Sequence, residues 1–280
     1  MPAASKLARR AAVAAESPAE LTAERAGGGI LVLTLNRPQR RNSLSEAMLD
    51  ALQGAIDAAD ADPTLRAVVL AAAGPVFSAG HDLKELTQHR SDPDGGRAYH
   101  RQIMDRCARM MCSIVRCRKP VIAAVGGPAL AAGCQLVASC DLAVAATTAT
   151  FATPGVNIGL FCSTPMVALS RNVPRKRAME MLLLGEPVAA DAAAAWGLVN
   201  RVVPAARVMD EAMALARLVA SKPKATVAIG KEAFYRQLEM ELVDAYAYTA
   251  GVMVENMMHA EAKEGIGAFL DKRAPDWDQS

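Results

Sequence analysis

Two short segments of the chain place small residues directly before an expected helix, which can bring backbone N–H groups close to a ligand. One segment runs from Val76 to Leu86 (VFSAGHDLKEL) and the other from Gly126 to Val137 (GGPALAAGCQLV). The first N–H groups of a helix have no acceptor inside that helix, and they attract negative charge. If each turn aims one N–H group at the same oxygen atom, the pair stabilises a developing oxyanion. In the first turn, the backbone N–H of His81 is the candidate donor.

Each feature of these segments also has a purely structural explanation. Four residues of the second segment are small and permit tight packing of a helix on a sheet, namely Ala129, Ala131, Ala132 and Gly133. Asp82 precedes Glu85 by three residues, so we expect it to cap the following helix rather than to act in catalysis. The imidazole of His81 contacts either a ligand or solvent. Gln135, just inside the second helix, can hydrogen-bond but cannot exchange a proton at neutral pH.

The composition argues against several other kinds of site. A net charge of +2 and an aromatic content of 4% do not favour nucleic acid as a partner. The six cysteines form no C-x-x-C pair and the four histidines have no ligand spacing, so we expect no metal site. We expect buried free thiols in a reducing compartment instead, at Cys107, Cys112, Cys117, Cys134, Cys140 and Cys162.

The beginning of the chain leaves its cellular location open. No apolar run approaches the ~20 residues that span a bilayer, so we expect no membrane span. Residues 1–29 are basic and rich in alanine at their start, without the apolar core of a secretory signal. We interpret them as a disordered tail of a cytoplasmic protein, with a transit peptide to the mitochondrial matrix as the alternative.

Alternating strands and helices are expected around both segments. Strands are predicted at the stretches ILVLTL, RAVVLAAA, VIAAVGG and DLAVAA, and helices over residues 42–60 and 101–117, the first capped by Ser43 with Glu46. This order indicates an α/β domain with crossover connections. From residue 207 to 270 the pattern is helical, broken at Lys222–Pro223 and around Gly265. We therefore divide the chain into a tail (1–29), an α/β core (30–204) and a helical C-terminal subdomain (205–280).

Four stretches, in order and with fitting spacing, resemble the motifs of one protein family. They are VFSAGHDLKEL, PVIAAVGGPALAAGCQLVASCDLAVA, FATPGVNIGLF and EGIGAFLDKR. On these motifs the chain, from about Ile30 to Trp277, resembles the crotonase superfamily, the enoyl-CoA hydratase/isomerase group. The resemblance implies a crotonase-like spiral of ββα units with a C-terminal helical subdomain that assembles trimers or hexamers.

The resemblance also implies an acyl-CoA ligand, with no cofactor beyond the coenzyme A of the thioester. The thioester oxygen would accept hydrogen bonds from the backbone N–H groups of His81 and Ala132. The path of the adenine and pantetheine would be lined by Ala79, His81, Asp82, Leu83 and Lys84. Phe269 and Lys272 would approach the CoA from the tail of the same or a neighbouring subunit.

The chain departs from this family at the two positions that matter for moving protons. Active hydratases of the superfamily use two glutamates, and here these positions hold Gln135 and Gly155, with the family's spacing of 20 residues (155 − 135). Both carboxylates are therefore missing, so ordinary hydratase activity is not expected. Restoring both glutamates should raise hydration, provided that Gly155 does not need a positive φ that glutamate resists.

Three functions remain open from the sequence. The favoured one is an acyl-CoA-binding protein of the hydratase/isomerase type, and as an enzyme it would act by another route through Asn157, Cys162, Ser163 or Thr164. The second is a non-catalytic protein that holds acyl-CoA or regulates fatty-acid metabolism. The third is a structural subunit that uses the helical tail to join related proteins.

Overall fold

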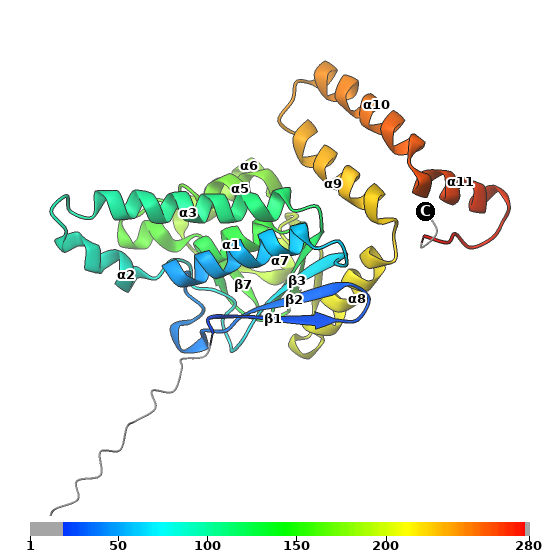
Figure 1. Cartoon of the computed structure of the whole chain (residues 1–280). Coiled ribbons are helices and arrows are strands. Elements are labelled where there is room, and N and C mark those ends of the chain that lie inside the picture. Colours follow the sequence, from blue (N-terminus) through cyan, green and yellow to red (C-terminus); the bar gives the residue numbers. More distant parts are fainter. Residues whose placement is uncertain (1–18, 278–280) are drawn as a thin grey trace, which may run out of the picture.

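The computed structural model describes residues 19–277, and its core is a six-stranded sheet with the order β1-β2-β3-β4-β6-β9 (Figure 1). The strands are β1 (Leu21–Ala26), β2 (Ile30–Leu35), β3 (Ala67–Ala72), β4 (Val121–Val125), β6 (Leu142–Ala146) and β9 (Arg201–Val203). Strand β1 is antiparallel to β2, and all other neighbours are parallel. Parallel neighbours require crossover connections, so the expected α/β architecture is confirmed.

The central strands are apolar because helices cover the sheet. Every residue of β4 is buried, as are the first five of β3. Helix α8 (Val208–Ala220) packs across β3, β4 and β6, whereas α1 (Glu46–Ala61) packs on β1 and β2 and is joined by α3 (Arg97–Arg116). Burial on both faces explains the nearly continuous apolar runs in the sequence.

Two local expectations at the start of the chain are corrected. Residues Leu21–Ala26, placed in the tail, form β1; the sequence gives no apolar run or alternation there because four of the six residues face solvent. The cap of α1 is Ser45, whose side chain accepts from the N–H of Met48, and not Ser43. The remainder of the expected tail, residues 1–18, lies outside the described residues.

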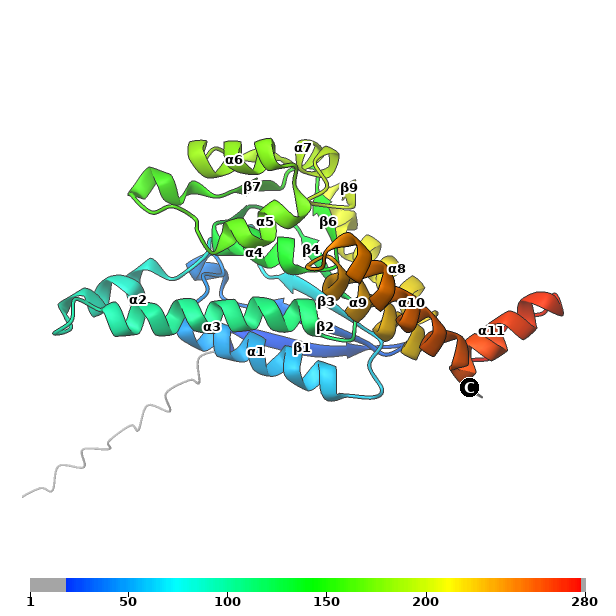
Figure 2. The same cartoon turned by 90° about the horizontal axis from the view of Figure 1, so that it is seen from above.

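A second, three-stranded sheet includes part of the small-residue segment 126–137. It consists of β5 (Ala129–Leu130), β7 (Thr150–Ala152) and β8 (Val188–Ala189), with β5 parallel to β7. Helix α4 (Ala132–Ser139) begins immediately after β5. The other helices near this sheet are α5 (Pro165–Asn172), α6 (Arg175–Leu184) and α7 (Ala190–Ala195), whereas α2 (Leu83–Gln88) lies beside α3 (Figure 2). The small sheet thus fixes the start of α4 at the edge of the core.

The C-terminal part is helical, as expected, and extends away from the core. Helices α9 (Lys224–Gln237), α10 (Leu242–Met258) and α11 (Ala260–Leu270) form an arm, at whose far end α11 lies (Figure 2). The break after α8 lies at Lys222–Pro223, but the last break lies at His259, and Gly265 is inside α11. No helix among residues 19–277 has the length and apolarity to cross a membrane.

A charged network attaches this arm to the sheet. The Lys231 ammonium donates to the Asp141 carboxylate at 2.7 Å and to the carbonyls of Ile114 and Lys119, both at 3.1 Å. The Tyr235 hydroxyl donates to the other Asp141 oxygen at 2.9 Å. The same carboxylate accepts from the N–H of Val121 at the start of β4. One buried ion pair therefore joins α9 to the first residue of a central strand.

The cysteines are free, and five are buried, but Cys112 is exposed, which corrects the expectation for that residue.

Replacing Lys231 by methionine should destabilise the protein strongly, because it leaves the Asp141 carboxylate buried without its cation. We expect a loss of about 3–5 kcal/mol in the free energy of unfolding, measured by urea denaturation. The control is Lys176→Met, an exposed lysine of α6, which should change stability by less than about 0.5 kcal/mol. Equal effects of the two substitutions would contradict the anchoring role.

Candidate functional site

The two small-residue turns meet in the structure. Ser78 forms a parallel bridge with Ala129, and the N–H of Leu130 donates to the Ser78 carbonyl at 2.8 Å. A Cβ atom at Gly80 would lie 2.9 Å from the Ala131 Cβ and 3.1 Å from the Ala132 nitrogen. Gly80 also has a φ of +85°, which only glycine adopts easily. A glycine is therefore required where the first turn touches the start of α4.

A buried asparagine shapes the first turn. Asn42 is fully buried, and its amide donates to the carbonyls of Ala73 and Val76 at 2.8 and 2.7 Å. The backbone carbonyl of Asn42 accepts from the Ser78 hydroxyl at 2.8 Å, and the N–H of Ala79 donates to the backbone carbonyl of Arg41 at 3.0 Å. The turn is thus fixed by hydrogen bonds to residues that precede α1.

Asp82 caps α2, as predicted, and its carboxylate is fully used. It accepts from the N–H of Lys84 at 3.1 Å, and from Ser43 and Arg37 at 3.2 Å each. Burial opposes ionisation, but these donors outweigh it and hold the pKa of Asp82 below its usual value. Asp82 is therefore ionised at neutral pH, and its hydrogen bonds hold the backbone directly after His81 in place.

The second turn is strained at Ala131. This residue has φ 50° and ψ −118°, a conformation that costs a non-glycine residue about 1–3 kcal/mol. Its N–H donates to the carbonyl of Ala152 at 2.9 Å, so strand β7 holds it in place. The strained residue sets the direction of the next peptide, that of Ala132.

Two backbone donors remain without an acceptor at this meeting point. Within residues 19–277, the N–H groups of His81 and Ala132 donate to no protein group. Ala132 is the first residue of α4, whose positive end adds to the attraction for a partial negative charge. Two such groups on touching turns can polarise one carbonyl oxygen.

Buried polar side-chain atoms without a partner gather around the same turns. Among the described residues there are five such atoms, and four belong to His81, Gln135 and Thr153. Thr153 directly follows β7, next to the Ala152 carbonyl that accepts from Ala131. It is not among the residues expected from the sequence, although it lies in the FATPG stretch. Buried polar atoms normally have partners, so this cluster indicates a place for a ligand or water.

Burial lowers the pKa of the His81 imidazole, against a smaller opposing effect of the Leu44 backbone. The ring is therefore neutral at neutral pH and adds no charge to the site.

Gly155 is buried, and the space beside it is already filled. Its φ is not positive, yet a Cβ would lie 2.5 Å from the Leu160 carbonyl oxygen and 2.8 Å from the Cys162 sulfur. Burial raises the pKa of the Cys162 thiol. Steric exclusion by this loop, and not backbone conformation, is what a glutamate at position 155 would have to overcome.

Two of the groups named for alternative chemistry hydrogen-bond to the backbone: Asn157 and Ser163 donate to the carbonyls of Gly185 and Phe161. Thr164 takes the N-cap position of α5, but its side chain forms no capping hydrogen bond. Of the four, Cys162 is the one that contacts the Gly155 position.

The residues expected along the CoA path are only partly brought together. Leu83 and Lys84 are exposed and line a surface depression of about 450 Å³ with Thr87 and Gln88. Phe269 and Lys272 lie at the end of the C-terminal arm, on the opposite side of the molecule from α2 (Figure 2). Within one chain they do not reach the turns.

Comparisons with known proteins agree with this fold. The model of the family described as enoyl-CoA hydratase/isomerase matches residues 25–280. Human enoyl-CoA hydratase domain-containing protein 3, mitochondrial, is 50% identical over 263 residues, which are 94% of this chain and 85% of that protein. Its crystal structure matches with a TM-score of 0.87 and 48% identity over 92% of this chain and 100% of that one. An enoyl-CoA hydratase structure from Mycobacterium smegmatis matches with a TM-score of 0.89 and 53% identity, covering 92% and 99%.

Adding a single methyl group at position 155 should destabilise the protein. Gly155→Ala forces the Leu160 carbonyl or Cys162 to move, and we expect a loss of about 1–3 kcal/mol in thermal or urea unfolding. Gly54→Ala is the control, because its Cβ meets nothing within 4 Å in the middle of α1. That control should gain about 0.5–1 kcal/mol. A Gly155→Ala protein as stable as the wild type would show that the loop has room for a side chain.

Proposed function

Because the chain belongs to the enoyl-CoA hydratase/isomerase family of the crotonase superfamily, we propose that it binds an acyl-CoA thioester at the two turns and hydrates enoyl-CoA at most very slowly. The observation that carries the proposal is the pair of backbone N–H groups, at His81 and Ala132, without a protein acceptor on touching turns. In the proposed complex, the thioester oxygen accepts a hydrogen bond from each of these two N–H groups. The unpartnered atoms of Gln135 and Thr153 border the acyl carbons next to the thioester.

The proposed lack of hydration follows from the two missing carboxylates. Each general acid or base typically contributes ~10²–10⁴ in rate, and two that act as a unit do not simply multiply. Their absence should therefore cost at least about 3–5 kcal/mol of transition-state stabilisation. Gln135 can orient a water or a carbonyl, but it cannot take a proton from that water.

The CoA part of the ligand is proposed to follow Ala79 to Lys84. Lys84 is exposed and has no ion-pair partner among the described residues, so its ammonium is available to a phosphate. Phe269 and Lys272 would complete the site from a neighbouring subunit. Large apolar side chains exposed on α9 to α11, such as Tyr246 and Phe269, support assembly into a trimer or hexamer.

The vertebrate relatives named enoyl-CoA hydratase domain-containing protein 3 are mitochondrial by name. Their similarity supports the mitochondrial alternative and not the cytoplasmic expectation. We therefore propose a mitochondrial location.

A second candidate function is a protein that holds acyl-CoA without turnover. The filled space beside Gly155 favours it, because a second carboxylate has no room there. Product formation from a panel of acyl-CoA thioesters separates the two functions: isomerisation, decarboxylation or hydrolysis indicates an enzyme, and saturable binding alone indicates a binding protein.

Butyryl-CoA should raise the thermal stability of the wild-type protein, since a ligand bound only by the native state stabilises it. The gain should approach ~2.7 kcal/mol at a ligand concentration of 100 times Kd. Lys84→Ala should weaken binding severalfold, whereas Lys176→Ala, at an exposed lysine far along the chain, should not. An unchanged melting profile over a wide range of concentrations would count against the CoA site.

Steady-state hydration of crotonyl-CoA should be absent or very slow in the wild type despite measurable binding. Gln135→Glu alone should raise the rate by about tenfold or less, because one carboxylate cannot serve both sides of the attacking water. Wild-type turnover in the ordinary range of ~1–10³ s⁻¹ would contradict the claim that the acid and base groups for hydration are missing.

A further inference from the structure

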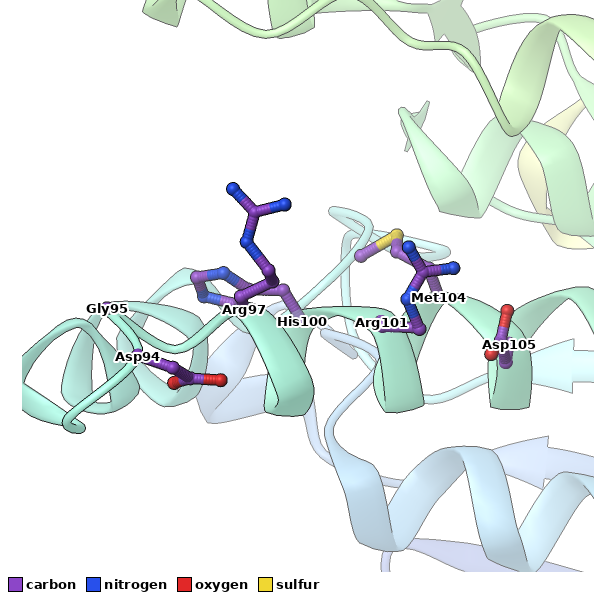
Figure 3. A pocket seen from close by; sticks show the side chains of 7 residues that line it. All are labelled: Asp94, Gly95, Arg97, His100, Arg101, Met104 and Asp105. Atoms are coloured by element: carbon purple, nitrogen blue, oxygen red, sulfur yellow. The ribbon is translucent and has the colours of Figure 1, made fainter.

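A second depression, of about 530 Å³, lies along α3 and contains two arginines and two aspartates. It is lined by Asp94, Gly95, Arg97, His100, Arg101, Met104 and Asp105 (Figure 3). The side chains of Arg97 and Arg101 project from the same side of the helix, away from α1 (Figure 3). Both are exposed, so a ligand can reach them.

Helix stability alone does not account for these positive charges, because they lie at the N-terminal end of α3. Arg97 and Arg101 lie within the first five residues of α3, where the helix dipole disfavours positive charge, and the first turn has no acidic residue. Among residues 19–277, the guanidinium groups of Arg97 and Arg101 have neither an ion-pair nor a hydrogen-bond partner. By contrast, Arg106 of the same helix pairs with Glu46 and Asp50.

The acidic residues of the depression do not neutralise these arginines. The Asp94 carboxylate accepts from the N–H groups of Gly96 and Ala98 at 2.9 and 2.8 Å, and these bonds keep its pKa below the usual value. Asp105 lies one turn beyond Arg101 and forms no ion pair within the described part of the chain. An anion from outside the chain would satisfy the two arginines.

Helix α4 presents Gln135 toward this helix. The hydroxyl of Ser139 lies 3.5 Å from the sulfur of Met111 on α3 and donates to the Gln135 carbonyl at 2.8 Å. Residues four apart share one face of a helix, so Gln135 lies on the face of α4 that contacts α3. Acyl carbons beside Gln135 would therefore lie next to α3.

The N-terminal end of α3, which carries Arg97 and Arg101, lies on the same side of the molecule as the proposed thioester site. His100 Nε2 hydrogen-bonds to the carbonyl of Leu86 on α2 at 3.0 Å, and α2 begins directly after the His81 turn that touches Ala132. At ~1.5 Å per residue, Arg101 lies about 15 Å before Met111, and Gln135 lies about 6 Å before Ser139. Helices α3 and α4 lead into the parallel strands β4 and β6, so Arg101 and Gln135 lie on the same side of the Ser139–Met111 contact, with Arg101 the farther of the two.

From this alignment we propose that the acyl group carries a carboxylate at its distal end, held by Arg101 and Arg97. The ligand class is then a short dicarboxylyl-CoA, whose chain passes Met104. This inference rests on the proposed function, because it takes the thioester to sit between His81 and Ala132. Guanidinium groups match carboxylate geometry in a bidentate manner.

The phosphates of CoA are the other possible source of an anion. They are less suited to these arginines because Lys84 already offers a cation beside the His81 turn. The depression at Lys84 and the depression on α3 share no lining residue. Two separate cationic positions fit a ligand with an anionic group at each end.

The test compares glutaryl-CoA with valeryl-CoA, which have the same number of acyl carbons, by calorimetric titration of the full chain. Glutaryl-CoA should bind about tenfold more tightly or better. Arg101→Gln, and Arg97→Gln to a lesser degree, should remove this preference and leave valeryl-CoA binding unchanged. The matched control is Arg109→Gln, an exposed arginine of α3 outside the depression, which should retain the preference.

Three other outcomes would contradict the carboxylate site or the proposed function. Equal wild-type affinity for the two thioesters would overturn the carboxylate site while leaving the acyl-CoA proposal intact. An Arg101→Gln protein that loses affinity equally for both would show that the arginine contacts CoA phosphate, which also overturns it. Failure of both thioesters to bind would refute the proposed function itself.

Discussion

The site depends on the close approach of the His81 turn to the first residues of α4. This approach leaves no room for a side chain at Gly80, and it requires Ala131 to hold a strained conformation. Buried Asn42 and strand β7 supply the hydrogen bonds that keep the two turns in place. Without these constraints the N–H groups of His81 and Ala132 would separate, or would find acceptors within the protein. The cost of the strain is offset by the rigid sheet on which both turns rest.

In the proposed function, this scaffold separates the binding of a thioester from the transfer of a proton. Backbone donors do not depend on side-chain identity, so they persist when the acid and base residues are lost. Gln135 keeps the shape of a glutamate but not its proton chemistry. At Gly155 the change goes further, because the Leu160 carbonyl and the Cys162 thiol have closed around the missing side chain. The loop is built for glycine, which is why restoring both glutamates is not a simple reversal. In the proposed acyl-CoA complex, Arg97 and Arg101 would instead select an acyl group with a distal carboxylate.

Much of the fold follows from sequence periodicity, and the failures have identifiable physical causes. Buried parallel strands such as β3 and β4 are visible as apolar runs, and the cap at Asp82 follows from its spacing. Strand β1 is an exposed edge, so its composition does not reveal it. Thr153 and the two arginines of α3 become candidates only because the folded chain leaves their polar groups without partners, which the sequence does not show. Gly155 was recognised as a departure, but the clash that fixes it depends on a loop five residues later.

A crystal structure with bound butyryl-CoA tests the central claim most directly. The account predicts that the thioester oxygen lies about 2.7–3.1 Å from both the His81 and the Ala132 backbone nitrogens. It also predicts that the first acyl carbons lie beside Gln135 and Thr153, without a carboxylate within reach of them. A thioester bound elsewhere, or one whose oxygen faces water while these two N–H groups stay unpaired, would contradict the account.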